Sequence, residues 1–140
     1  MIPDQKPLFQ FTHQLRSRYS ETDKMGYVYY GHFLQYFEVA RTELVRSLGV
    51  SYKKMEDDGF MLPVIHSEIQ YKNPVFYDEL MDIEVMMFKK PHVRLETFYR
   101  VTTKEKSVIN TLGSVTLVFM NAETRRPVKG PDYFINAVSL

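Results

Sequence analysis

The chain has 140 residues, of which 44% are hydrophobic and 25% are charged, and its formal net charge is +1. This length suits one core, so we expect a single domain over residues 1–140 with its core in about residues 10–120. The near-neutral charge argues against a nucleic-acid binder that acts mainly by neutralising phosphates. The sequence has no cysteine, which excludes disulfides, thiolate zinc sites and a cysteine nucleophile.

The ends and the apolar stretches of the sequence indicate where the protein acts. The N-terminal residues do not show a basic segment followed by an apolar run, so no secretory signal is visible. No apolar stretch approaches the length of a membrane span. We therefore expect a cytoplasmic protein that does not insert into a membrane.

The first half of the chain predicts a strand, a loop and a long helix. Residues Phe9–Arg18 alternate imperfectly and predict a strand, whereas Tyr19–Tyr30 carries Gly, Asp, Ser and Thr and predicts a loop. Apolar residues then recur every three or four positions over His32–Leu48, which is typical of a helix with one buried stripe. Gly49 is well placed just past its C-terminus, and Ser51–Asp57 predicts a short second helix.

The second half changes to the two-residue alternation of strands. We expect strands over Met61–Tyr71, Leu80–Lys89, His92–Thr102 and Ser107–Met120. A short terminal helix is expected over Tyr133–Val138. Short polar links between the last strands favour an antiparallel meander. The sequence therefore predicts an α+β fold, in which about five antiparallel strands pack against one long helix. Several strands are apolar on both sides, which favours an oligomer.

The segment from Tyr19 to the start of the long helix is the best candidate for chemistry. Asp23 lies in a turn-rich loop, and the helix begins a few residues later, near Gly31. The first turn of a helix has N–H groups without intrahelical acceptors, and they can hold an oxyanion. A nearby carboxylate can attack a carbonyl carbon or activate water. The alternative is that Asp23 only hydrogen-bonds its own turn, as loop aspartates often do.

Two blocks of residues carry a resemblance to a known family. The first is Arg18-Tyr19, Glu21-Thr22-Asp23, Gly26, Val28-Tyr29, Phe33 and Tyr36 through Arg41; the second is Pro63-Val64, Ile69, Tyr71, Pro74 and Asp78-Glu79-Leu80. With the order of elements, they resemble the hotdog-fold thioesterases, specifically the branch of the 4-hydroxybenzoyl-CoA thioesterases and related acyl-CoA thioesterases. The resemblance covers about residues 10 to 120.

The resemblance implies a sheet wrapped around the helix, dimers or tetramers with active sites between subunits, and hydrolysis of acyl-CoA thioesters. No cofactor is implied, because coenzyme A is part of the substrate. Asp23 matches the catalytic aspartate, and Tyr30 stands where a backbone N–H points to the thioester carbonyl. Many members have a histidine in place of Tyr30 and Pro or Gly in place of Met25. A backbone donor survives such a change, whereas an acid–base role of the side chain does not.

Four further residues are candidates for contact with a substrate. Gly31 leaves room for a ligand at the helix start, and His32 borders it. Glu38 lies on an apolar part of the helix, where we expect an orienting or structural role, through a bond to the loop. His66 lies on the strand after the helix, where a neighbouring subunit could approach the site. The histidines do not have the spacing of metal ligands on one helix, so we expect no metal.

Short basic clusters at predicted turns are candidates for the phosphates of coenzyme A. They are Lys89-Lys90 and Arg125-Arg126, the latter followed by Lys129. Each cluster alone is more often solvated charge at a turn. We expect at least one of them to contact the nucleotide end of the substrate.

Other functions on the same fold stay open from the sequence. A non-catalytic acyl-CoA or acyl-carrier binding module would bind ligand without releasing thiol, and Asp23 would then only shape its turn. An enzyme that acts on acyl groups attached to carrier protein is a third alternative. A hydratase is disfavoured, since the motif has one aspartate and no partnering histidine. The sequence does not define the acyl group.

Overall fold

The computed structural model describes residues 1–104 and 108–138. Its helices are α1 (His32–Ser47), α2 (Tyr52–Asp57) and α3 (Asp132–Val138), with a 3-10 turn at Tyr19–Glu21. Its strands are β1 (Phe9–Arg16), β2 (Phe60–Met61), β3 (Val64–Tyr71), β4 (Leu80–Met87), β5 (Arg94–Thr102), β6 (Ile109–Val118) and β7 (Met120–Asn121). The long helix and the main strands occur in the order expected from the sequence.

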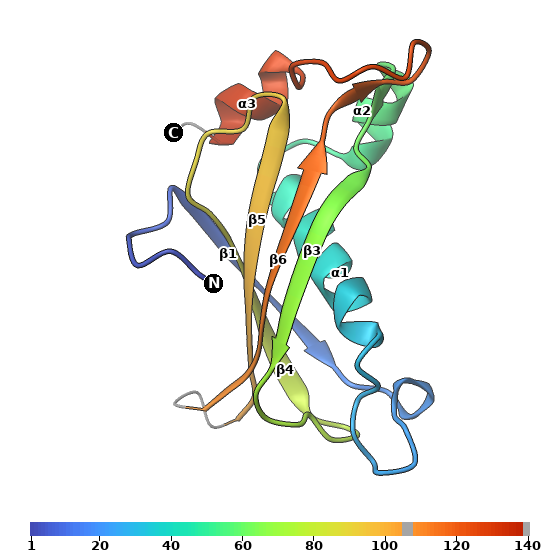
Figure 1. Cartoon of the computed structure of the whole chain (residues 1–140), viewed down its shortest axis with the longest axis vertical. Coiled ribbons are helices and arrows are strands. Elements are labelled where there is room, and N and C mark those ends of the chain that lie inside the picture. Colours follow the sequence, from blue (N-terminus) through green and yellow to red (C-terminus); the bar gives the residue numbers. More distant parts are fainter. Residues whose placement is uncertain (105–107, 139–140) are drawn as a thin grey trace.

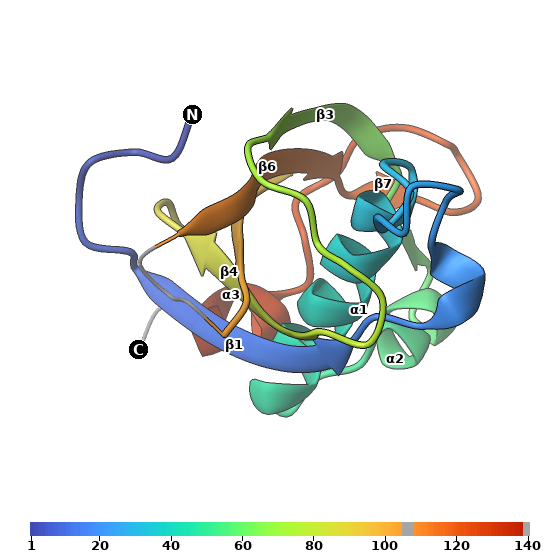
Figure 2. The same cartoon turned by 90° about the horizontal axis from the view of Figure 1, so that it is seen from below.

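Five strands form one antiparallel sheet in the order β1-β4-β5-β6-β3, so β1 and β3 are its two edges. The sheet curves around α1, which lies against the concave face (Figure 1, Figure 2). This arrangement confirms the predicted α+β hotdog fold with a five-stranded antiparallel sheet around one long helix. Among the described residues, no helix is long and apolar enough to cross a membrane.

The core forms where the apolar stripe of α1 meets the sheet. Phe37 and Ala40 of α1 are fully buried, and the Phe37 ring stacks on Tyr99 of β5 with 4.3 Å between ring centroids. Gly113 of β6 faces the same ring, and a Cβ atom at this position would overlap the Phe37 side chain. The absence of a side chain at Gly113 therefore sets how closely the helix approaches the sheet.

The observed strands are shorter than the predicted ones, and the first strand after the long helix is also divided. The strand expected from Met61 is interrupted at Pro63, which lacks an N–H for the ladder; β2 pairs instead with β7, and β3 begins at Val64. The strand expected over residues 107–120 is observed from Ile109 to Val118, and its first residue lies outside the described part of the chain. Helix α1 ends at Ser47, followed as expected by Gly49, with φ of 80°.

The loop that contains Asp23 lies at one end of the molecule. Residues 19–31 lead into the first turn of α1, and the helix then runs toward α2 at the other end (Figure 1). The turns between β4 and β5 and after β7 lie at that other end, with α3 beside the first of them (Figure 1). The fold therefore separates the basic clusters from the loop within one chain.

Candidate active site

The carboxylate of Asp23 is held by its own loop. Oδ1 accepts hydrogen bonds from the backbone N–H groups of Met25 (2.9 Å) and Tyr27 (3.3 Å). The backbone N–H of Asp23 donates to the carbonyl oxygen of Tyr27 at 2.8 Å, and Gly26, with φ of 79°, completes the turn. Asp23 thus makes the local turn contacts typical of aspartate, and Oδ2 has no partner among the described residues.

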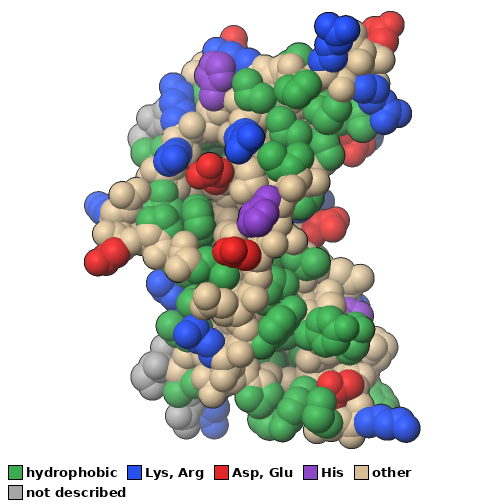
Figure 3. Space-filling model, in the orientation of Figure 1, with side chains coloured by type: hydrophobic (Ala, Val, Ile, Leu, Met, Phe, Trp, Pro, Cys, Tyr) green, Lys and Arg blue, Asp and Glu red, His purple; other side chains and the backbone are tan. Residues whose placement is uncertain are grey.

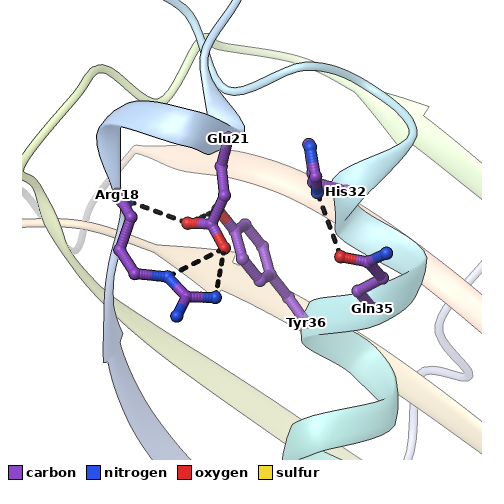
Figure 4. Close-up of polar contacts among 5 residues, drawn as sticks. All are labelled: Arg18, Glu21, His32, Gln35 and Tyr36. Carbon is purple, nitrogen blue, oxygen red and sulfur yellow. Dashed lines mark hydrogen bonds and ion pairs between the residues drawn. The ribbon is translucent and has the colours of Figure 1, made fainter.

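A buried carboxylate ties this loop to α1. Glu21 is only 4% exposed, and its side chain accepts a hydrogen bond from the Tyr36 hydroxyl of α1 at 2.8 Å. It also accepts from the backbone N–H of Arg18 (2.8 Å) and from its Nε (3.2 Å) and Nη2 (2.9 Å), as Figure 4 shows. The loop is therefore fixed to the second turn of the helix by a charged, buried contact.

The hydrogen bonds decide the ionisation of Glu21. Burial is the largest single influence and favours the neutral acid, but the hydrogen bonds from Arg18 and Tyr36 and the Arg18 charge together outweigh it. The pKa of Glu21 is consequently below its usual range. Burial, followed by the bond to Glu21, raises the pKa of Tyr36, so its hydroxyl stays a donor. Glu21 is part of the sequence motif, but the motif alone does not indicate this role.

The start of α1 supplies free N–H groups. The N–H of His32 donates to the Tyr29 carbonyl at 2.9 Å, and that of Phe33 to the Tyr30 carbonyl at 3.4 Å. The N–H groups of Tyr30 and Gly31 donate to no acceptor within the described residues. They are the unpaired donors expected at a helix start, where they favour negative charge.

Asp23 and Tyr30 line the same cavity, which has a volume of about 290 Å³. Its walls come from the loop, the first turn of α1, the end of β3 and the segment before β4, and they are mostly apolar. The wall residues include Phe33, Tyr71, Pro74, Val75 and Thr111. The Tyr71 hydroxyl donates to the Tyr30 carbonyl at 3.1 Å, which links β3 to the helix start.

Two other candidates on α1 have different surroundings. His32 lies in the first turn, and its Nδ1 is 3.0 Å from Oε1 of Gln35, so the ring borders the helix start as expected (Figure 4). Glu38 does not bond to the loop, because Tyr36 makes that contact instead. Glu38 is exposed and lines a second cavity farther along α1. The expected orienting bond from Glu38 is therefore wrong within this chain.

The remaining candidates do not come together with Asp23 in one chain. His66 pairs with Thr116 on the face of the sheet opposite to Gly113, and so points away from α1. Lys89 and Lys90 lie in the turn after β4, and Arg125 and Arg126 lie in the turn after β7. Both turns are at the end of the molecule far from the Asp23 loop (Figure 1). These residues could reach the cavity only from a second copy of the chain.

The described residues do not contain a group of three or more His, Cys, Asp or Glu side chains that could hold a metal ion. The cavity is lined by one carboxylate residue, Asp23, and by Lys72 and Asn73 among mostly apolar walls, with the two unpaired backbone donors at the helix start. This combination suits acyl transfer, in which an oxygen gains charge beside fixed N–H groups.

Comparisons with known proteins agree with this chemistry. Residues 17–138 match the model of the thioesterase-like superfamily. The chain is 35% identical over 92 residues to an Aquifex aeolicus protein with a provisional esterase name, which covers 66% of each chain. It is 44% identical over 66 residues to Bacillus subtilis YneP, provisionally named an acyl-CoA thioesterase, which covers 47% of this chain and 48% of YneP. The matches thus span less than two thirds of either relative.

A solved structure supports the same relationship. The crystal structure of a DHNA-CoA thioesterase from Staphylococcus aureus matches with a TM-score of 0.80 and 33% identity, over 86% of this chain and 80% of that one. Fold and sequence point to the same group, and the chain belongs to the thioesterase-like superfamily.

Proposed function

We propose that the chain hydrolyses acyl-CoA thioesters to a free acid and coenzyme A. The observation that carries the proposal is the shared cavity, which is lined by Asp23 and by Tyr30, at a helix start with two unpaired backbone N–H groups. Family membership and the thioesterase names of relatives support it.

The proposed chemistry uses the free oxygen of Asp23. Oδ2 attacks the thioester carbon to give a mixed anhydride, which water then hydrolyses, or it takes a proton from the water that attacks. In both routes the carbonyl oxygen becomes negative, and the N–H groups of Tyr30 and Gly31 donate to it. The carbon–sulfur bond then breaks, and coenzyme A leaves as the thiolate. Both routes use the same contacts.

Thiol release from a panel of acyl-CoAs tests this function. Straight, branched and aromatic acyl groups are each incubated with the protein, and free thiol is measured over time. We expect several-fold differences between acyl groups and clear release from at least one. A protein that binds acyl-CoA but releases thiol from none would instead be a binding module. The hydrogen bonds from Met25 and Tyr27 to Asp23 favour that second candidate, because they give the carboxylate a structural role.

We further propose that the protein acts as a homodimer or homotetramer that pairs through β3. This strand is a sheet edge, and its apolar residues Val64, Ile65 and Tyr71 are each about half exposed. Hydrophobic side chains gather toward both ends of the face that carries β3 (Figure 3). Light scattering should give at least twice the chain mass. Ile65→Lys should lower it, whereas Leu8→Lys, at an exposed residue before β1, should not.

Two finer parts of the function stay predictions. At least one of the clusters Lys89-Lys90 and Arg125-Arg126 is proposed to meet the phosphates of coenzyme A from a second copy, since one chain keeps them far from Asp23. Neutralising the cluster that makes this contact should then raise KM and weaken its dependence on salt. We also propose that the reaction takes place in the cytoplasm, since a sequence without cysteine fits a reducing compartment. Fractionation of cells that express the protein tests this location.

A further inference from the structure

A second cavity, of about 560 Å³, lies along the far half of α1. It is bounded by α1, α2, β2 and the start of β3, and its walls are mostly apolar. The apolar wall residues include Met55, Phe60, Leu62, Val64, Leu117 and Phe119. A mostly apolar cavity of this size, with a few polar groups, is typical of a site for a small molecule.

The polar side of this cavity is built around Arg41. Arg41 is only 7% exposed, and its Nη1 donates to the Tyr99 hydroxyl at 3.0 Å. The Thr97 hydroxyl donates to the Val115 carbonyl at 2.8 Å, so the 2.6 Å contact between Thr97 and Tyr99 must use the Tyr99 proton. The chain of donors therefore runs from Arg41 through Tyr99 and Thr97 to Val115, and both hydroxyl protons in it are used.

Two donors remain, and both belong to residues that line the cavity. Nε of Arg41 donates to the Tyr52 hydroxyl at 3.1 Å, so the Tyr52 proton is left without an acceptor in the described structure. Every fully buried side-chain nitrogen or oxygen among the described residues has a partner. Nη2 of Arg41 has no hydrogen bond among the described residues, so this nitrogen is not fully buried, and Arg41 is one of the residues that line the cavity.

The charge of Arg41 also lacks a close partner. No carboxylate in the described ranges lies within ion-pair distance of it. Glu38 and Glu56 line the cavity and are exposed, and the Glu38 charge contributes to the raised pKa of Tyr52. A buried guanidinium without an ion pair is costly, and an oxygen from a ligand would offset part of that cost. Burial, more than any other influence, raises the pKa of Tyr52 to about 12, which keeps its hydroxyl a donor.

We propose that this cavity holds the far end of the acyl group, and that Arg41 and Tyr52 select acyl groups that end in an oxygen acceptor. This inference rests on the proposed thioesterase function. The apolar walls would surround the body of the acyl group, while Nη2 of Arg41 and the Tyr52 hydroxyl donate to its terminal oxygen. A terminal hydroxyl and a terminal carboxylate both offer an oxygen acceptor, and either would accept hydrogen bonds from both donors.

Matched acyl-CoA pairs test the preference. Each straight-chain acyl-CoA is compared with its ω-hydroxy and ω-carboxy forms, and kcat/KM is measured at several chain lengths. We expect at least one oxygenated form to exceed its plain partner by about tenfold, the value of a hydrogen bond to a charged donor. Tyr52→Phe should reduce this ratio by about fivefold. Tyr133→Phe, which removes a surface hydrogen bond to Asp58, should leave the ratio unchanged.

A binding experiment does not depend on turnover. The Nε–H signal of Arg41 is followed by NMR while 1-hexanol or hexanoate is added to the full chain. We expect at least one of them to shift this signal in the wild-type protein, and more weakly after Tyr52→Phe. No shift with either probe would overturn the inference. Thiol release without any preference for oxygenated chains would also overturn it, whereas no release from any acyl-CoA would refute the proposed function itself.

Discussion

Replacing Glu21 tests whether the buried carboxylate holds the Asp23 loop on α1. Glu21→Gln keeps the shape of the side chain but removes its charge. The contact with the Tyr36 hydroxyl is buried and 2.8 Å long, and a hydrogen bond to a charged group contributes about 1.5–3 kcal/mol. The guanidinium of Arg18 is mostly exposed, so solvent screening leaves its contribution small. We therefore expect Glu21→Gln to lower the free energy of unfolding by about 2 kcal/mol.

Urea unfolding measures this loss, and a double-mutant cycle with Tyr36→Phe assigns it. Because both substitutions break the same contact, their combined effect should be smaller than the sum, with a coupling of about 1–2 kcal/mol. Amide exchange at Met25 and Tyr27 should also become faster in Glu21→Gln, since the loop loses its anchor. Strict additivity of the two substitutions, or unchanged exchange in the loop, would refute the reasoning.

The contribution of Glu21 to the free energy of unfolding should also depend on pH, and its lowered pKa sets the direction. The pKa of Glu21 is lowered in the folded protein from an ordinary value of 4.5. Its stabilising contribution is therefore fully present above that value, and it is lost as the pH falls through the lower folded pKa. The difference between wild type and Glu21→Gln should shrink when unfolding is measured well below pH 4.5 rather than at pH 7. An equal difference at both values would contradict an ionised Glu21.

Two glycines give further predictions. Gly31→Pro removes one of the two free N–H groups at a φ of −68° that proline accepts, so kcat should fall by about 10²–10³-fold if that group donates to the oxyanion. Gly31→Ala is the matched control, since it keeps the N–H, and the atoms nearest to its Cβ belong to the movable Tyr29 ring, the first at 2.8 Å. Equal rates for both variants would exclude a role for this donor. Gly113→Ala should lower the free energy of unfolding by about 1–3 kcal/mol, because its Cβ would overlap Phe37; urea unfolding checks this, and unchanged stability would mean that helix and sheet can move apart freely.

The main elements were predictable from the sequence because they depend on local patterns. The spacing of Phe33, Phe37, Ala40 and Leu44 defined the buried stripe of α1, and all four are buried. Alternation likewise identified the long strands. The split at Pro63 was less accessible, because β2 and β7 each have two residues and exist only through their pairing.

The side chains that hold the walls of the two cavities in place make contacts between residues far apart in the sequence. These contacts could therefore not be predicted from local sequence patterns. Glu21 is fifteen positions from Tyr36, although both stood in the motif and Arg18 three residues earlier was a signal of an ion pair. Arg41 joins α1 to α2 and β5 through Tyr52 and Tyr99, and Tyr99 is 58 positions away. A side-chain network across three elements leaves no periodic pattern in the sequence.

The placement of Asp23 shows what the sequence could and could not define. The motif identified the residue and the nearby helix start, and the structure places both on one cavity. The sequence left a turn-forming Asp23 as the alternative to a catalytic one. In the structure, one oxygen makes the turn contacts and the other is free, so the two roles are compatible.

The rate of thiol release by Asp23→Asn tests the central claim most directly. Asparagine keeps an oxygen that can accept from Met25 and Tyr27, so the loop should hold its shape while the carboxylate is lost. On the best acyl-CoA of the panel, kcat should fall by about 10²–10⁴-fold, with unfolding by urea unchanged. Asp57→Asn, at an exposed residue of α2, should retain the wild-type rate. An Asp23→Asn protein that hydrolyses at the wild-type rate would contradict the account.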